Sequence, residues 1–135
     1  MSLREVEILL VEDSAPDAEM TMRTLRKRGI ANHLVWVRDG VEALDYLFCE
    51  NEFEGRESGD PKMVLLDLKM PRVDGMMLYR AIAAGTPSLA RRVIFVTGDV
   101  AGPDAERFLE ESGCRWLAKP FRLGDLLRSV REALA

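Results

Sequence analysis

The fold class is decided near the N-terminus, where the chain reads Val6-Glu7-Ile8-Leu9-Leu10-Val11-Glu12-Asp13. This stretch is apolar apart from Glu7 and ends in two carboxylates. A short apolar run bounded by polar residues is typical of a strand buried on both faces, as in a parallel sheet covered by helices. Ser14 follows, with Asp17 three residues later, and this pattern predicts the start of a helix.

The same alternation of apolar strands and amphipathic helices continues to the C-terminus. Further strands are expected at residues 34–37, 63–66, 93–96 and 115–118. Helices are expected from Ser14 to Gly29 and at residues 40–50, 75–84, 103–112 and 123–134. A polar loop is expected at 51–62. This order predicts an α/β fold in which a parallel sheet, buried on both faces, carries helices on both sides, in one domain spanning residues 1–135.

The composition excludes several classes of protein. The chain has 135 residues, 47% hydrophobic and 31% charged, with a net charge of −4. These values argue against a disordered chain, and the acidic balance argues against nucleic-acid binding. No apolar run approaches the roughly 18 residues of a membrane span, and residues 1–5 do not resemble a signal peptide. Cys49 and Cys114 fit neither a disulfide framework nor a metal-ligand spacing, so a reduced, cytoplasmic protein is expected.

Polar residues with useful chemistry stand at the ends of four expected strands: Glu12 and Asp13, Asp67, Thr97, and Lys119. In open parallel sheets, sites form outside the carboxyl ends of the strands. Converging carboxylates need a cation, and oxygen ligands with room for water suit Mg²⁺. The hydroxyl and the ammonium add donors for a phosphoryl group. Each residue alone has a simpler explanation as a cap, a turn or a solvated charge; together they suggest phosphoryl transfer to an aspartate.

Four motifs carry a resemblance to a known family over essentially the whole chain: residues 11–13, residues 65–71 followed by Asp74-Gly75, residues 96–98, and residues 117–121. With these motifs the sequence resembles the receiver domain of two-component response regulators. The resemblance implies a flavodoxin-like, doubly wound, five-stranded sheet of order 2-1-3-4-5 with five helices.

The resemblance also implies a role for each site residue. Asp67 would accept a phosphoryl group from a phosphohistidine of a sensor histidine kinase or a histidine phosphotransfer protein. Mg²⁺ would be held by Glu12, Asp13, Asp67 and the backbone carbonyl of Lys69. Thr97 and Lys119 would bind the phosphoryl oxygens.

Different parts of the chain resemble different receivers. Residues 12–19 and 39–47 resemble stand-alone regulators that partner bacterial phytochromes, whereas residues 93–98 and 108–127 resemble receivers of hybrid sensor kinases. The cognate kinase and the downstream target therefore stay open. Trp116 stands where the family usually has Tyr or Phe, and it is either a core aromatic or a bulky form of the rotamer switch that reports phosphorylation. The last helix has enough apolar residues for the core and for a homodimer interface.

Three alternative functions are compatible with parts of this pattern. A phosphorylation-independent adaptor with a receiver fold usually lacks one of the five site residues, and none is missing here. An aspartate-nucleophile phosphatase of the haloacid dehalogenase type needs a second Asp two residues after the nucleophile, where this chain has Lys69. A flavodoxin-like cofactor binder needs a phosphate-binding loop after the first strand, where Glu12 and Asp13 would repel a phosphate.

Overall fold

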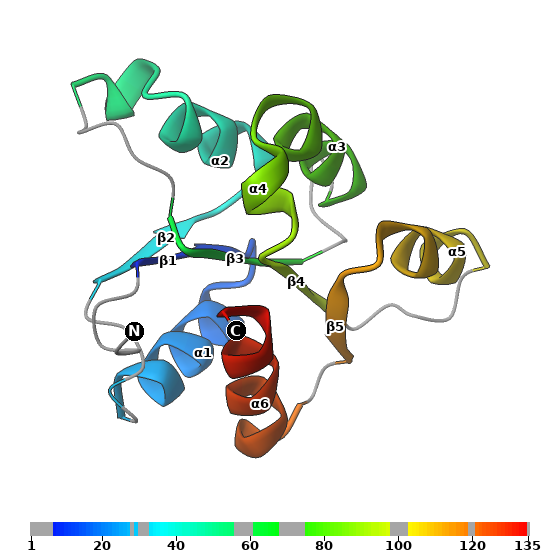
Figure 1. Cartoon of the computed structure of the whole chain (residues 1–135). Coiled ribbons are helices and arrows are strands. Elements are labelled where there is room, and N and C mark those ends of the chain that lie inside the picture. Colours follow the sequence, from blue (N-terminus) through cyan, green and yellow to red (C-terminus); the bar gives the residue numbers. More distant parts are fainter. Residues whose placement is uncertain are drawn as a thin grey trace.

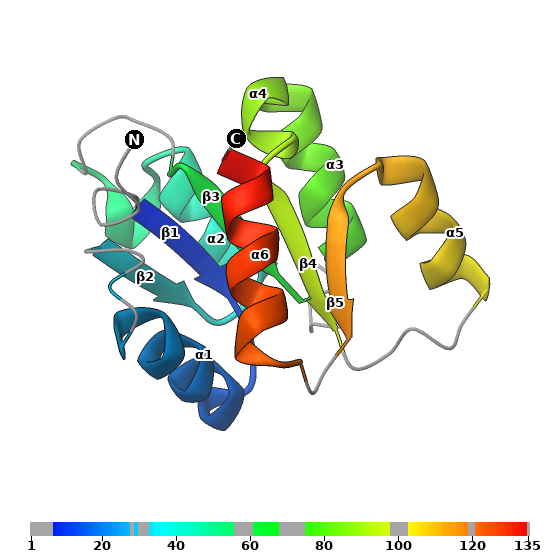
Figure 2. The ribbon, with the colours of Figure 1, turned by 60° about the horizontal axis from the view of Figure 1, so that its bottom comes forward.

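Five parallel strands form one sheet of order β2-β1-β3-β4-β5, as predicted. The computed structural model describes residues 7–27, 29, 33–55, 61–67, 75–97, 103–118 and 121–134. The strands are β1 (Glu7–Val11), β2 (His33–Val37), β3 (Met63–Leu66), β4 (Val93–Thr97) and β5 (Arg115–Ala118). Their arrowheads point toward the same edge of the sheet (Figure 2). Polar residues that follow the strands are therefore collected at that edge.

The helices are α1 (Ala15–Lys27), α2 (Gly40–Leu47), α3 (Gly75–Gly85), α4 (Pro87–Ala90), α5 (Pro103–Ser112) and α6 (Leu123–Leu134), with a 3₁₀ turn, η2, at Asn51–Phe53. Helices α1 and α6 cover one face of the sheet, α2, α3 and α4 cover the other, and α5 lies beside β5 (Figure 1). None of the helices in the described part of the chain is long and apolar enough to cross a membrane.

The prediction of five helices was wrong, because a short helix, α4, follows α3. Pro87 occupies the first turn of α4, and Thr86 stands at its N-cap position. Proline lacks the N–H that an unbroken helix needs but is well suited to a first helical turn, so the chain ends one helix and begins another here. The turn η2 likewise falls within the predicted loop at 51–62.

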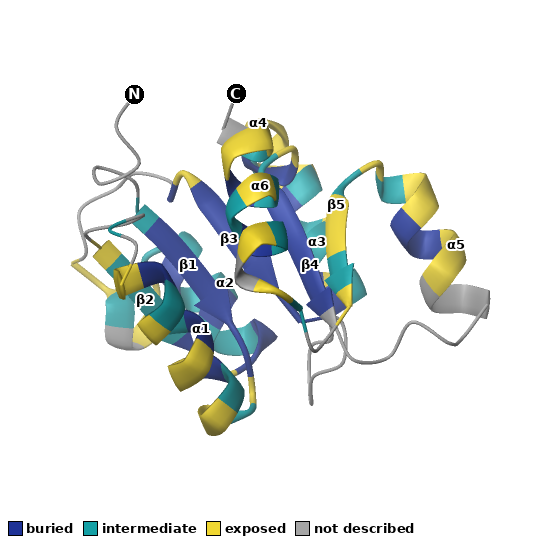
Figure 3. Ribbon diagram, turned by 90° about the horizontal axis from the view of Figure 1, so that it is seen from below, coloured by how far each residue is buried: buried dark blue, intermediate teal, exposed yellow. Residues whose placement is uncertain are grey.

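The apolar run of β1 is explained by its burial on both faces. Ile8 and Leu10 pack in the layer that contains residues of α1 and α6. Leu9 and Val11 pack in the opposite layer, with residues of α2 and α3. All four side chains are at most 3% exposed. Neighbouring β3 is buried over its whole length in the same way, so these two strands form the centre of the core (Figure 3).

Strand β5 differs from this pattern, and the expectation that every strand is buried on both faces was wrong for it. Arg115, Trp116 and Ala118 are exposed, and Leu117 is only half-buried (Figure 3). Among the residues that the structure describes, β5 is the last strand in the sheet order, so it forms one edge of the sheet. Trp116 is 45% exposed, so its interpretation as a core aromatic was wrong as well.

Candidate functional site

The hydrogen bonds of the sheet extend past the ends of its central strands into the acidic residues. The backbone N–H of Glu12, the first residue after β1, donates to the carbonyl oxygen of Val37 over 3.1 Å. The N–H of Asp67, the first residue after β3, donates to the carbonyl oxygen of Val11 over 3.2 Å. Both residues therefore stand at the carboxyl edge of the sheet with their backbones held by a neighbouring strand.

Three carboxylates meet at this edge, as the sequence predicted. Glu12, Asp13 and Asp67 each offer one oxygen, and these oxygens lie within 4.8 Å of one another. Glu12 is 4% exposed and Asp67 7% exposed, whereas Asp13 is exposed to solvent. Two like charges about 4 Å apart near a protein surface repel each other by about 4 kcal/mol. A cation between the three oxygens removes that repulsion.

The spacing of the oxygens fits a small octahedral cation. Oxygens bound at about 2.1 Å to one Mg²⁺ lie about 3.0 Å apart when adjacent and about 4.2 Å apart when opposite. The oxygens of the cluster lie within 4.8 Å of one another, which is slightly wider than about 4.2 Å and leaves room for one carboxylate to act through water. The exposed side of the cluster, at Asp13, provides access for the waters that Mg²⁺ usually keeps.

Glu12 is held by two further contacts. Its carboxylate Oε1 accepts a hydrogen bond from the backbone N–H of Ser14 over 3.1 Å. Its backbone carbonyl accepts one from the indole Nε1–H of Trp36 over 2.8 Å. Sequence reasoning did not single out Trp36 as part of the site. The predicted sheet order places its strand beside the first strand, but the register of the two strands and the contact of the indole with Glu12 do not follow from the sequence.

Of the two residues predicted to bind the phosphoryl oxygens, the structure describes the backbone of Thr97. Thr97 is the last residue of β4, the strand next to β3, and its backbone pairs with Ala118 of β5. Thr97 is thus at the carboxyl edge, as predicted. The predicted roles of Lys69 and Lys119 fall on residues outside those that the structure describes.

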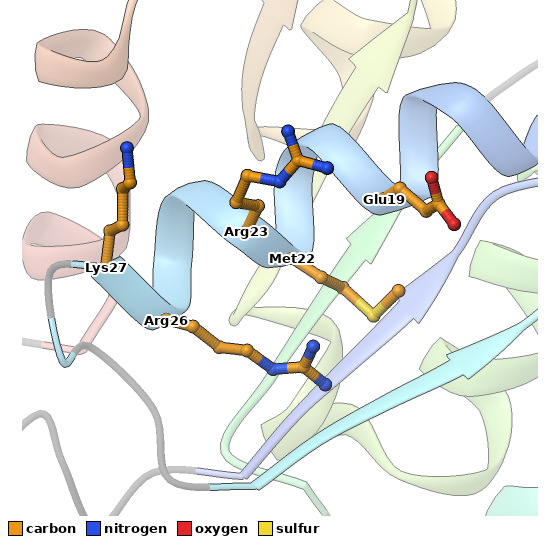
Figure 4. A pocket seen from close by; sticks show the side chains of 5 residues that line it. All are labelled: Glu19, Met22, Arg23, Arg26 and Lys27. Atoms are coloured by element: carbon orange, nitrogen blue, oxygen red, sulfur yellow. The ribbon is translucent and has the colours of Figure 1, made fainter.

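A pocket elsewhere on the surface has a different character. It lies along α1 and is lined by Glu19, Met22, Arg23, Arg26 and Lys27 (Figure 4). Its three cationic side chains make it unsuitable for a metal ion. None of the residues that line this pocket belongs to the acidic cluster, so the two features are distinct.

The sheet order and the acidic cluster are those of a receiver domain, and the sequence agrees: the family model of the response regulator receiver domain matches residues 8–131. The chain belongs to this family. Receiver domains are phosphoacceptors of two-component signalling, and this is the function of the chain.

Individual relatives support the assignment. The chain is 37% identical over 125 residues to the probable methanogenesis regulatory protein FilR2 of Methanothrix harundinacea, covering 93% of this chain and 79% of that protein. It is 33% identical to the response regulator Rcp1 of Synechocystis, covering 92% and 83%. The solved bacteriophytochrome response regulator AtBRR superposes with a TM-score of 0.82 at 35% identity, covering 95% and 91%.

Solved structures similar to this chain contain a divalent metal ion or a phosphorylated residue. The receiver domain of the sensor histidine kinase PA1611 from Pseudomonas aeruginosa has a magnesium ion in its active-site cleft, at 28% identity and a TM-score of 0.77, covering 96% of this chain and 97% of that one. Rcp1 was solved with Mn²⁺, at 31% identity and a TM-score of 0.75, covering 95% and 91%. The cyanobacterial regulator RcpA was solved in its phosphorylated form, at 28% identity and a TM-score of 0.76, covering 95% and 90%.

Proposed function

We propose that Asp67 is the residue that receives the phosphoryl group. The observation that carries this proposal is its central position: Asp67 follows β3, with the acidic pair after β1 on one side and Thr97 at the end of β4 on the other. A phosphoryl group on Asp67 would thus have a cation site on one side and a hydroxyl-bearing residue on the other. Neither Glu12 nor Asp13 is flanked in this way.

Each remaining site residue has a role in this proposal. Glu12 and Asp13 would hold Mg²⁺ together with Asp67 and the backbone carbonyl of Lys69. When bound there, the ion would neutralise the charge that the phosphoryl oxygens bring to the acidic cluster. Thr97 and Lys119, which follows β5 in the sequence, bind the phosphoryl oxygens through a hydroxyl and an ammonium group.

The proposed reaction transfers a phosphoryl group from a histidine nitrogen to a carboxylate oxygen of Asp67. An oxygen of the Asp67 carboxylate forms a bond to phosphorus while the bond from phosphorus to the donor histidine nitrogen breaks, and the electron pair stays on that nitrogen. The chain's own residues position the carboxylate and stabilise the transferred group, so the domain assists its own phosphorylation. Attack of water on the phosphorus later returns Asp67 and inorganic phosphate, and the same residues assist that step.

The partners follow from this chemistry. The phosphoryl donor is a sensor histidine kinase or a histidine phosphotransfer protein in the cytoplasm, and residues 1–135 form one receiver domain. The readout is a conformational change recognised by a downstream protein rather than by nucleic acid or a membrane. A homodimer through α6 remains part of the proposal, although Leu126 and Val130 of that helix are fully buried in the chain's own core. Sedimentation with and without phosphorylation tests the homodimer.

The experiment for Asp67 is phosphorylation by a small phosphodonor. Wild type, Asp67→Asn and the control Asp45→Asn are incubated with Mg²⁺ and phosphoramidate, and their intact masses are measured. Asp45 lies on α2, outside the cluster, where it accepts a hydrogen bond from Asn51. We expect one added phosphoryl group in wild type and in Asp45→Asn, and none in Asp67→Asn. An equal gain in Asp67→Asn would show that another residue is the acceptor. No gain in any of the three would favour the phosphorylation-independent adaptor.

A further inference from the structure

We propose that Trp36 is a positioning residue for the acidic cluster. Its indole N–H fixes the peptide group between Glu12 and Asp13, and through that peptide it holds both carboxylates where they can bind Mg²⁺. This inference rests on the magnesium site proposed above.

The contact joins two strands at the point where the site begins. The indole Nε1–H of Trp36 donates to the backbone oxygen of Glu12 over 2.8 Å. Trp36 is paired with Leu10 in the register of β1 and β2, so its side chain reaches two residues further along β1 than its own partner. The backbone N–H of Glu12 is bonded to Val37 of the same strand. Both backbone polar groups of Glu12 are therefore tied to β2.

The geometry of the peptide bond carries this restraint to Asp13. The carbonyl of Glu12 and the N–H and Cα of Asp13 lie in one plane, because the peptide bond does not rotate freely. Fixing the Glu12 oxygen therefore also fixes the direction in which the chain enters Asp13. This matters because Asp13 is the exposed member of the cluster, and the repulsion between the carboxylates favours its moving away.

The indole is itself held by a second contact, over the face of its ring. The guanidinium Cζ of Arg38 lies 5.1 Å from the centre of the Trp36 ring, within the range of a cation–π contact. The backbone N–H of Arg38 donates to Oε2 of Glu42 over 2.8 Å, in the first turn of α2. The ring is also partly buried against the core layer that contains α1 and α6. The start of α2 is thus connected through Arg38 and Trp36 to the acidic pair.

The sharpest test removes the N–H and keeps the ring. Trp36 is replaced with benzothienylalanine, which has the shape of tryptophan but carries sulfur in place of the N–H, and the same replacement at exposed Trp116 is the matched control. Mg²⁺ affinity of the folded, unphosphorylated chain is measured by calorimetry. A neutral hydrogen bond changes an equilibrium constant by about two- to tenfold, so we expect Mg²⁺ binding to weaken by that factor at position 36 and to stay unchanged at position 116.

A second measurement separates positioning from general stability. In Trp116→Phe the single remaining indole N–H signal in a ¹H–¹⁵N spectrum belongs to Trp36, and adding Mg²⁺ should shift it.

The genetically simpler Trp36→Phe variant should lower Mg²⁺ affinity by a similar factor while keeping a ring beside Arg38. A purely structural role would lower thermal stability without changing either the affinity of the folded chain or this signal.

The outcomes distinguish the two proposals. Weaker Mg²⁺ binding at position 36 alone, with a shifted indole signal, supports the positioning role. Tight Mg²⁺ binding by wild type and equally tight binding by both Trp36 variants would overturn the role of Trp36 and leave the magnesium site intact. No Mg²⁺ binding by wild type would overturn the magnesium site, and the role of Trp36 with it.

Discussion

The centre of the sheet and its β5 edge are built differently. In β1 and β3 every side chain after Glu7 is at most 3% exposed, and the hydrogen-bonded ladder continues into Glu12 and Asp67. In β5 most side chains are exposed, and Trp116 is 45% exposed. The clustered carboxylates of Glu12, Asp13 and Asp67 therefore follow strands whose side chains are almost fully buried. Thr97 ends β4, which is also buried but has the exposed strand β5 as its other neighbour.

A cluster of aromatic rings lies beside the β5 edge and stabilises it. The rings of Tyr79, Phe95 and Phe108 form three pairs with centroids 5.5 to 5.7 Å apart. Phe108 is buried in this cluster and anchors α5 to β4 and α3. Such pairs add about 0.5–1.5 kcal/mol beyond the burial of their area. We infer that these ring contacts hold α5 at one face, whereas the exposed outer surface of β5 can move when the domain is phosphorylated.

The largest expected effect compares a central leucine with one at the edge. Leu66→Ala removes a fully buried side chain of β3, and we expect it to lower the free energy of unfolding by about 2–5 kcal/mol. Leu117→Ala changes a half-buried side chain of β5. We expect it to lower the free energy of unfolding by less than half as much, because its site is already partly open to water. Urea unfolding of the two variants measures the difference. Equal losses would contradict the contrast between centre and edge.

The next effect concerns the cation site. Asp13→Ala removes one of three clustered carboxylates, and we expect Mg²⁺ affinity to fall by at least about tenfold, equivalent to about 1.4 kcal/mol. Glu12→Gln should have a smaller effect, because we expect Glu12 to act mainly through a bound water. Glu19→Ala on α1 is the control, since it changes the net charge equally outside the cluster. Unchanged affinity in Asp13→Ala would rule out its role as a direct ligand.

A smaller effect should appear at high pH beside the edge. Burial, together with a hydrogen bond to Cys114, raises the pKa of Tyr79 to about 12. An unfolded chain releases this proton near pH 10. In the folded state Tyr79 keeps its proton to a higher pH than in the unfolded chain. The contribution of Tyr79 to the free energy of unfolding is therefore fully present below about pH 10 and is lost as the pH rises toward 12.

The variant Tyr79→Phe isolates that contribution from other groups that titrate in this range. Stability of wild type and Tyr79→Phe is compared by urea unfolding at several pH values between 9 and 12. We expect the wild type to lose more stability than the variant above pH 10. Parallel pH profiles would show that Tyr79 ionises as it does in an unfolded chain.

The smallest effect is a spectroscopic change at Trp116. Its side chain borders a small pocket with Leu109, Glu106 and Glu110 of α5, so a movement of either element changes the surroundings of the indole. With 5-fluorotryptophan incorporated, a beryllofluoride mimic of the phosphoryl group should shift the ¹⁹F signal of Trp116. Trp116→Phe identifies that signal. A signal that stays in place would argue against Trp116 as a reporter of phosphorylation.

The sequence by itself determined the strands, most helices and the three carboxylates that cluster at the sheet edge. The apolar runs ended at Glu12 and Asp67, and a strand end is a local feature that needs no knowledge of distant contacts. The motifs shared with receiver domains then gave the sheet order 2-1-3-4-5, which the structure confirmed. Helix α6 was predicted with its observed bounds, since its apolar spacing is also local.

Only the tertiary structure decided which of these elements were buried and which side chains met. The residues 115–118 suggest a buried strand, yet β5 is the last strand of the sheet in the described part of the chain, and three of its four side chains are exposed. The hydrogen bond from Trp36 to Glu12 joins residues 24 positions apart, and it exists only because β1 and β2 pair in one register. Local patterns set the conformation of each segment, whereas burial and long-range contacts depend on which segments become neighbours.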